Sequence, residues 1–218
     1  MKIVCEARKL ANFIAGLDSF ETLHIKEEFC YQHIGALFVD ITLQAGLNYN
    51  SVVKPRVQRV LLNYPEADTA QRFHLLIENH GLQQVIKWKS DIKINRLKRL
   101  VYFALDNKIN TCVDFKIFLM DNKNREEFLK LNGVGPKTVD YTLKLLNFDT
   151  VAVDRHIYSF VEMAAIKAES YAFTKKVVEY AADFLQISRS SMDYSIWRYM
   201  SNNKKLNIKN NSQLRLEI

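Results

Sequence analysis

The stretch "LNGVGPKTVDYTLKLLNFDTVAVDRH", from Leu131 to His156, decides the fold of this chain. Gly133 and Gly135 separate the short segment "REEFLKL" from the apolar-patterned segment "PKTVDYTLKLL". Glycine suits a turn in which a side chain would clash or φ must be positive. Pro136 fits the first position of a helix, where its missing N–H costs no hydrogen bond. The pattern therefore predicts a helix, a tight turn and a second helix.

The second helix of this hairpin should bury one face, because Val139, Leu143 and Leu146 recur at helical spacing. The turn leaves backbone N–H groups without partners at the helix N-terminus, and such groups bind anions. A phosphate of a nucleic-acid backbone would fit there. A contact of this kind positions a nucleic acid without reading its sequence.

The rest of the chain also has helical patterns, with six glycines, three prolines and no run that alternates as a strand. We expect a buried helix from Tyr31 to Ala45, and a short helix opened by Asn124 as N-cap. Further apolar stripes at helical spacing are Val53, Val57, Val60 and Leu61; Leu97, Leu100, Val101 and Ala104; and Ile157, Phe160, Val161 and Ala164. The sequence therefore predicts an all-α protein.

Composition and charge narrow the class of protein. The 218 residues are 48% hydrophobic, which suits one large unit or two small lobes. The formal net charge of +7 favours anionic partners, nucleic acid first. No run approaches the ~20 apolar residues of a membrane span. Charges at Glu6, Arg8 and Lys9 interrupt any signal-peptide core, so we expect a cytoplasmic protein, associated with the nucleoid if the cell is bacterial.

The opening stretch resembles the helix-hairpin-helix DNA glycosylases of the endonuclease III and 8-oxoguanine glycosylase type. Their hallmark is similar to L-P-G-V-G-x-K-T-A, an apolar helix and then A-V-D-x-H; here it reads "LNGVGPKTVD" and "VAVDRH", with Asn132 in place of the usual proline. The resemblance implies two helical lobes with a DNA-binding cleft between them. It places a central lobe at residues 31–144, with the hairpin at about 124–146, and a terminal lobe at residues 1–30 and 145–218.

The resemblance also implies that Lys137 attacks C1′ of the damaged nucleotide and that Asp154 assists. Residue chemistry agrees, since a lysine can displace the base and form a Schiff base that permits strand cleavage by β-elimination. A carboxylate would stabilise the positive charge that develops on the sugar. Two other interpretations stay open. Lys137 could be a phosphate-binding lysine of a non-catalytic hairpin, and Asp154 could be only an N-cap.

The remaining DNA contacts follow from the same resemblance. Base access requires the nucleotide to leave the duplex, and Gln44 could fill the gap or simply be a polar residue at a helix end. Asp40 and Trp197 are candidates for the base pocket. The sequence favours a solvated helix position for Asp40 and a core position for Trp197. The hairpin residues expected to touch DNA are Gly133, Val134, Gly135 and Thr138.

The charged residues of "INRLKRL", which are Arg96, Lys98 and Arg99, are expected to form a solvated face, and contact with phosphates is the alternative. In the family the hairpin tends to hold a monovalent cation, K⁺ or Na⁺, through backbone carbonyls. The matching positions here are Leu129, Leu131 and Val134. No cysteine follows Cys112, so we expect no iron–sulfur cluster and no other cofactor.

These observations predict a monomeric DNA glycosylase with AP lyase activity, which excises an oxidised base during base-excision repair. Its partner would be double-stranded DNA with a damaged base or an abasic site, and no membrane. One alternative is a purine-directed glycosylase for 8-oxoguanine or a mispaired base. An alternative of another class is a non-enzymatic helix-hairpin-helix module, which would have no need for the pair Lys137 and Asp154.

Overall fold

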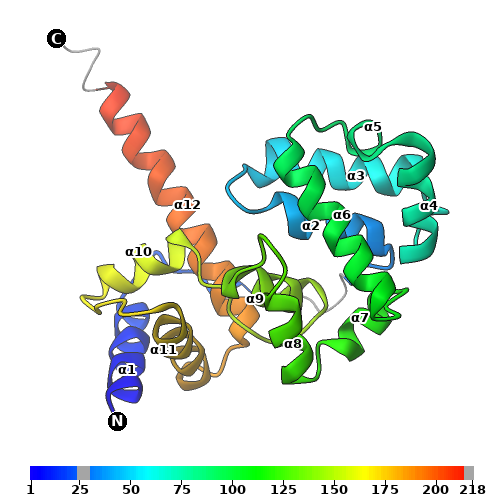
Figure 1. Cartoon of the computed structure of the whole chain (residues 1–218). Coiled ribbons are helices and arrows are strands. Elements are labelled where there is room, and N and C mark those ends of the chain that lie inside the picture. The colour runs from blue at the N-terminus through cyan, green and yellow to red at the C-terminus, as the bar shows by residue number, and fades with distance from the viewer. Residues whose placement is uncertain (24–29, 214–218) are drawn as a thin grey trace. The chain divides into compact units, whose positions relative to one another are not determined.

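The computed structural model of the chain describes residues 1–23 and 30–213, with residues 203–213 described by their backbone only. Within these ranges the chain is helical and has no strand, which confirms the predicted all-α class. It forms two compact units, the central unit (residues 30–147) and the terminal unit (residues 1–23 and 148–213) (Figure 1). The predicted lobes divide at 30/31 and 144/145, and the units divide between 23 and 30 and at 147/148. None of the helices so described is long and apolar enough to cross a membrane.

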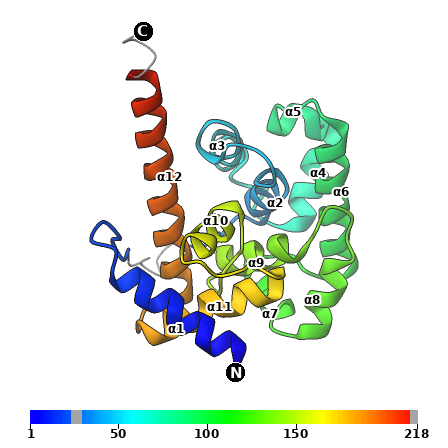
Figure 2. The ribbon, with the colours of Figure 1, turned by 90° about the vertical axis from the view of Figure 1, so that its left-hand side faces the viewer.

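The central unit is built around α2 (Ile34–Leu43), a helix whose ten residues are all buried. Figure 1 and Figure 2 show α2 beside α3 and α6, and these helices pack against it. The helices in contact with α2 include α3 (Lys54–Asn63), α4 (Ala70–His80), α6 (Asp91–Asp106) and α9 (Pro136–Leu145). The unit is completed by the π-helical turn η1 (Tyr49–Val53), α5 (Leu82–Ile86), α7 (Cys112–Phe118) and α8 (Asn122–Leu129).

Helix α2 is shorter than the predicted range of Tyr31–Ala45. The ring nitrogen Nδ1 of His33 accepts the N–H of Ala36 at 3.1 Å, so His33 acts as N-cap and fixes the first turn. Tyr31 therefore lies before the helix. At the other end Gln44 is the C-cap, and Gly46 with φ of +80° turns the chain away.

The first helix of the hairpin begins earlier than predicted, and its N-cap is not Asn124. Asp121 caps α8 by accepting the N–H of Lys123 at 2.8 Å. Asn124 lies inside the helix, where its side-chain amide donates to the carbonyl of Phe118 at 2.9 Å. Both residue types cap well, so composition alone could not choose between them.

The terminal unit consists of α1 (Lys2–Ala15), α10 (Arg155–Met163), α11 (Tyr171–Phe184) and α12 (Arg189–Gln213). Helix α1 packs along α11, and α10 packs against α12. The predicted apolar stripe of α10 is confirmed, because all four of its residues belong to the buried core of this unit. The stripes predicted for the central unit are also buried, except that Leu61 is only half-buried.

Candidate functional site

The hairpin predicted from the sequence is present in the central unit. After α8, the carbonyl of Leu131 accepts the N–H of Val134 at 2.9 Å and closes a turn. Gly133, third in this turn, has φ of +90°, as a type II turn requires. Pro136 then opens α9, as predicted. Gly135 meets neither of the two expectations for a glycine in this turn, because its φ is −115° and nothing lies within 4 Å of the place that a Cβ would take.

The N-terminus of α9 carries no side-chain cap. Its first backbone bond runs from the N–H of Val139 to the carbonyl of Gly135, at 3.0 Å. Pro136 has no N–H, so the amides of Lys137 and Thr138 lack intrahelical acceptors. The arrangement can accept an anion at the helix end. Thr138 is buried as a whole residue, and Lys137 is half-buried.

Lys137 is the second residue of α9 and is half-buried. It forms no hydrogen bond or ion pair with the residues that the structure describes. By contrast Lys130, just before the turn, pairs with Glu127 at 2.6 Å. Lys137 is thus a lysine whose ammonium group has no role in holding the described fold together.

Arg96 of α6 lies against the hairpin, contrary to the prediction that it is solvated. A Cβ placed on Gly133 would come within 2.3 Å of Arg96 Nε, so the two residues are in close contact. The side chain of Arg96 is half-buried, and its Nε is buried with no hydrogen-bond acceptor among the described residues. Arg96 has no carboxylate partner among the described residues and lies beside an uncapped helix end, so this corner of the central unit is electropositive.

Lys93, one turn before Arg96 on α6, holds the end of α2. Its ammonium group donates to the carbonyls of Thr42 at 2.7 Å and Ala45 at 2.9 Å. Burial, and secondly the charge of Arg96, lower the pKa of Lys93 to about 8. Lys93 and Arg96 are thus two neighbouring cations on α6. Among the residues described, no acidic side chain pairs with Arg96.

A small cavity of about 20 Å³ lies beneath the hairpin turn. Its lining includes Arg96, Gly133, Val134 and Thr138. Such a volume holds about one water molecule, because a water needs roughly 10–15 Å³. The cavity is too small for a nucleobase and is therefore no base pocket. It is a small gap where Arg96 packs on the turn.

Asp40 is completely buried in the middle of α2, so the favoured interpretation of a solvated helix position is wrong. Its Oδ2 accepts the hydroxyl of Tyr31 at 2.6 Å and that of Tyr49 at 3.5 Å. Its Oδ1 accepts the hydroxyl of Tyr141 at 2.8 Å. We call these four residues the Asp40 cluster. Tyr49 is its most exposed member, at 40%, and a role of Asp40 in a base pocket stays a prediction.

Burial raises the pKa of the Asp40 carboxyl, although the three hydroxyl bonds act in the opposite direction. Burial raises the pKa of Tyr49 as well, to about 12, so its hydroxyl keeps its proton as a donor. Sequence reasoning missed the tyrosines. The available signal was a single aspartate inside a helix that is otherwise uncharged.

Gln44 and Trp197 occupy positions that leave their predicted roles open. Gln44 is half-buried at the end of α2, and its Nε2 is buried with no acceptor among the described residues. Trp197 is 38% exposed on α12, so the core interpretation is wrong. Its ring stacks on Tyr194, with centroids 5.9 Å apart and planes 12° apart. The gap-filling and base-pocket roles stay predictions.

Asp154 caps α10 in the terminal unit. Its Oδ1 accepts the N–H of His156 at 2.8 Å and that of Ile157 at 3.1 Å, which confirms the predicted N-cap. Val151, Ala152 and Val153 before it are buried and anchor the segment. The N–H of Ala152 also donates to Asp193 of α12 at 2.8 Å. The carboxylate is thus held on a fixed backbone. Lys137 belongs to the central unit and Asp154 to the terminal unit.

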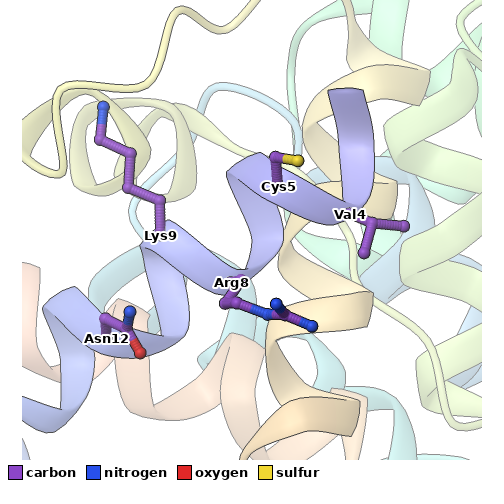
Figure 3. A pocket seen from close by; sticks show the side chains of 5 residues that line it. All are labelled: Val4, Cys5, Arg8, Lys9 and Asn12. Atoms are coloured by element: carbon purple, nitrogen blue, oxygen red, sulfur yellow. The ribbon is translucent and has the colours of Figure 1, made fainter. Parts of the chain in front are cut away.

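An open depression of about 380 Å³ lies on α1 (Figure 3). The side chains around it come from one helix and spread apart from one another, as Figure 3 shows. Two of them already serve the fold, since Lys9 donates to the carbonyl of Ala165 at 2.7 Å and Arg8 lies over the ring of Phe184. The side chains of this surface do not converge on a common point, so we assign no site to it.

The predicted cation at the hairpin concerns backbone carbonyls, and one of them, that of Leu131, already accepts the Val134 N–H. Carbonyl oxygens have two lone pairs, so the K⁺ or Na⁺ prediction stays open. Among the residues described, no three His, Cys, Asp or Glu side chains gather as a metal-binding group. Comparison with known proteins adds no relative, because no protein-family model, curated protein or solved structure matches the chain.

Proposed function

We propose that this chain is a DNA N-glycosylase with AP lyase activity, which removes a damaged, oxidised base during base-excision repair. The observation that carries the proposal is Lys137, a lysine with no partner among the described residues, at the uncapped N-terminus of the second hairpin helix. Lys93 and Lys130, by contrast, each have an acceptor within the chain. A nucleophile must instead be free to reach a substrate.

The reaction proceeds in two stages. The uncharged Nζ of Lys137 attacks C1′, the bond from C1′ to the base nitrogen breaks, and the base leaves with the bonding electrons and takes up a proton. Opening of the sugar ring then gives a Schiff base between Lys137 and C1′. Loss of a proton from C2′ breaks the C3′–O bond and cleaves the strand, and water finally releases the lysine.

Asp154 supplies the negative charge for the first stage. Breaking the glycosidic bond develops positive charge on the sugar, which a fixed carboxylate stabilises. Both amide bonds of its cap end on Oδ1, so Oδ2 remains available to face the sugar. The cap orients this carboxylate before substrate binds, and such preorganisation is what electrostatic catalysis needs.

The DNA backbone would be held at the hairpin. The amides of Lys137 and Thr138 point out of the helix end, and the guanidinium of Arg96 lies against the turn at Gly133. Donors of this kind bind phosphate and are indifferent to base sequence. The formal net charge of +7 favours the same polyanionic partner.

Two alternatives are carried with the proposal. A purine-directed glycosylase for 8-oxoguanine or a mispaired base would use the same lysine and carboxylate with another base pocket. A non-enzymatic DNA-binding module would use the hairpin amides and Arg96 alone. Asp154 distinguishes the classes only weakly, because capping gives it a structural role as well.

Borohydride trapping on a duplex with one abasic site tests the proposal. Wild-type protein should give a covalent protein–DNA adduct, and Lys137→Gln should give none while it still binds the duplex. Lys130→Gln is the matched control, because this exposed lysine lies seven residues earlier in the same hairpin. An adduct that persists in Lys137→Gln would assign the chemistry to another amine, such as that of Met1. Wild-type binding without any adduct would favour the non-enzymatic module.

A panel of duplexes, each with one lesion, identifies the base. Nicking should occur on one or a few oxidised bases and depend on Lys137. Nicking confined to 8-oxoguanine or to a mispaired purine would select the purine-directed alternative.

A further inference from the structure

The Asp40 cluster is unusual because α2 is otherwise uncharged. All ten residues of α2 are buried, and Asp40 has no exposed surface. Among the residues that the structure describes, no cation is bonded to its carboxyl, which accepts the three hydroxyls of Tyr31, Tyr49 and Tyr141. An apolar side chain at this position would avoid the cost of burying a carboxyl group. Stability alone therefore does not explain why a carboxyl group occupies this buried position.

A directional role explains the cluster better. Packing of apolar side chains tolerates small rotations of a helix, whereas a hydrogen bond has a preferred distance and angle. The three hydroxyls reach the carboxyl from three different places: the segment before α2, the turn η1 and helix α9. The carboxyl thus ties α9 to the buried α2 through one defined bond, from Tyr141 to Oδ1 at 2.8 Å.

Tyr141 is four residues after Lys137 on α9, so the two side chains stand on the same face of the helix, one turn apart. Side chains of a helix tilt toward its N-terminus, so Lys137 projects from this face toward the hairpin turn. Any rotation of α9 about its axis that stretches the bond from Tyr141 to Asp40 also swings Lys137. The apolar stripe of α9, on a different face, does not fix this direction so sharply.

We propose that Asp40 and Tyr141 are positioning residues for Lys137: their hydrogen bond fixes the rotation of α9 and so aims the lysine. This inference rests on the proposed function, in which Lys137 is the nucleophile. Asp40 acts on Lys137 through Tyr141. Tyr31 and Tyr49 donate to the other carboxyl oxygen, Oδ2, and take no part in the bond to α9.

Four substitutions test the proposal in the full-length protein. Tyr141→Phe and Asp40→Leu remove the bond, and Asp40→Asn keeps an amide oxygen that accepts the Tyr141 hydroxyl. Tyr31→Phe is the matched control, because it removes one hydroxyl from Oδ2 and leaves the bond of Oδ1. Urea denaturation of each variant identifies any that fails to fold.

The first readout separates the rate of reaction from binding. The rate of borohydride-trapped adduct formation at saturating abasic-site duplex should fall about 10- to 100-fold in Tyr141→Phe and Asp40→Leu, since small misplacement of a reacting group has effects of this size. The dissociation constant for the duplex should stay within about twofold. Asp40→Asn and Tyr31→Phe should stay near the wild-type rate.

The second readout follows Lys137 without any substrate. After reductive methylation with ¹³C-formaldehyde, the Lys137 signal, assigned by its loss in Lys137→Arg, should shift in Tyr141→Phe and Asp40→Leu but not in Tyr31→Phe. If wild type forms no adduct, the proposed function fails and this spectrum alone decides the positioning role. Equal rates and equal spectra in Tyr141→Phe and Tyr31→Phe would overturn the inference. So would an Asp40→Asn variant as slow as Asp40→Leu, which would show that the charge matters and not the bond.

Discussion

The N-termini of α9 and α10 carry the two proposed catalytic residues, and they are built in opposite ways. α9 begins with Gly135 and Pro136 and has no side-chain cap, so its amides stay open to a ligand. α10 begins with Asp154, whose carboxylate occupies the corresponding amides. An open helix end receives an external anion, whereas a capped end fixes an anion of the protein itself. One helix end thus suits substrate binding, and the other presents a charge to the substrate.

The largest effect should come from changing the charge at the capped end. Asp154→Asn should lower the rate of base release by about 10²- to 10³-fold, because loss of a preorganised electrostatic group has effects of this order. Its unfolding free energy should change by less than about 0.5 kcal/mol, since asparagine caps as well as aspartate. Single-turnover base release and urea denaturation measure the two quantities.

Asp154→Ala is the companion variant that breaks both roles. Its rate of base release should fall as far as that of Asp154→Asn. Because the cap is lost too, its unfolding free energy should also fall by about 0.5–2 kcal/mol. If Asp154→Asn released base at the wild-type rate, Asp154 would be a cap and nothing more.

The two glycines sharpen the description of the open end. Gly133→Ala should cost about 1–3 kcal/mol of unfolding free energy, because φ is +90° there and the new Cβ would displace Arg96. Gly135→Ala should cost less than about 1 kcal/mol, because its φ is negative and its surroundings are open. Urea denaturation compares them. A larger cost at Gly135 would show that the turn differs from the one described.

Arg96 should make DNA binding at the open end of α9 depend on salt concentration. We expect Arg96→Gln to weaken binding to damaged and undamaged duplexes by a similar factor, roughly 10-fold or less at moderate salt. The slope of log affinity against log salt should fall by about 0.9, the value for one lost phosphate contact. Arg99→Gln, an exposed position on the same helix, is the control. An effect confined to damaged DNA would place Arg96 in base recognition.

Lys93 extends the comparison to a C-terminal helix end, with the smallest expected effect because its side chain is only half-buried. The pKa of Lys93 is lowered from 10.5 to about 8 in the folded chain. Between these pH values the unfolded chain binds more protons, so the unfolding free energy should rise with pH across this window. The unfolding free energy of Lys93→Met should lack this rise. The difference between the unfolding free energies of wild type and Lys93→Met, each measured with urea, gives the contribution of Lys93 at each pH. A difference that stays flat from pH 8 to 10.5 would contradict the burial of this ammonium group.

Local chemistry explains which features the sequence could predict. The turn at Gly133, the start of α9 at Pro136 and the cap at Asp154 each depend on residues within a few positions of one another. The same holds for the buried stripes, because helical periodicity is a local signal. Even the failure at Asn124 is local, since Asp121 offered a competing cap three residues away.

Long-range contacts explain what the sequence could not show. The bond from Tyr141 to Asp40 spans 101 residues, so the sequence around either residue does not predict the other as its partner. Arg96 looked like part of a solvated face because the turn it contacts, at Gly133, comes much later in the chain. A charged residue in an apolar helix indicates that some such contact exists, but the fold must supply its identity.

The discontinuity of the terminal unit bears on how the chain acquires its structure during synthesis. The central unit is one continuous segment, whereas the terminal unit joins residues 1–23 to residues 148–213. Helix α1 is synthesised long before its packing neighbour α11, which begins only at Tyr171. At about 5–20 residues per second, α1 waits roughly ten to thirty seconds with its apolar stripe uncovered, long enough for chaperone contact. All residues of the central unit, Lys137 included, are synthesised within that interval, before Asp193 of α12, which anchors the segment that precedes Asp154.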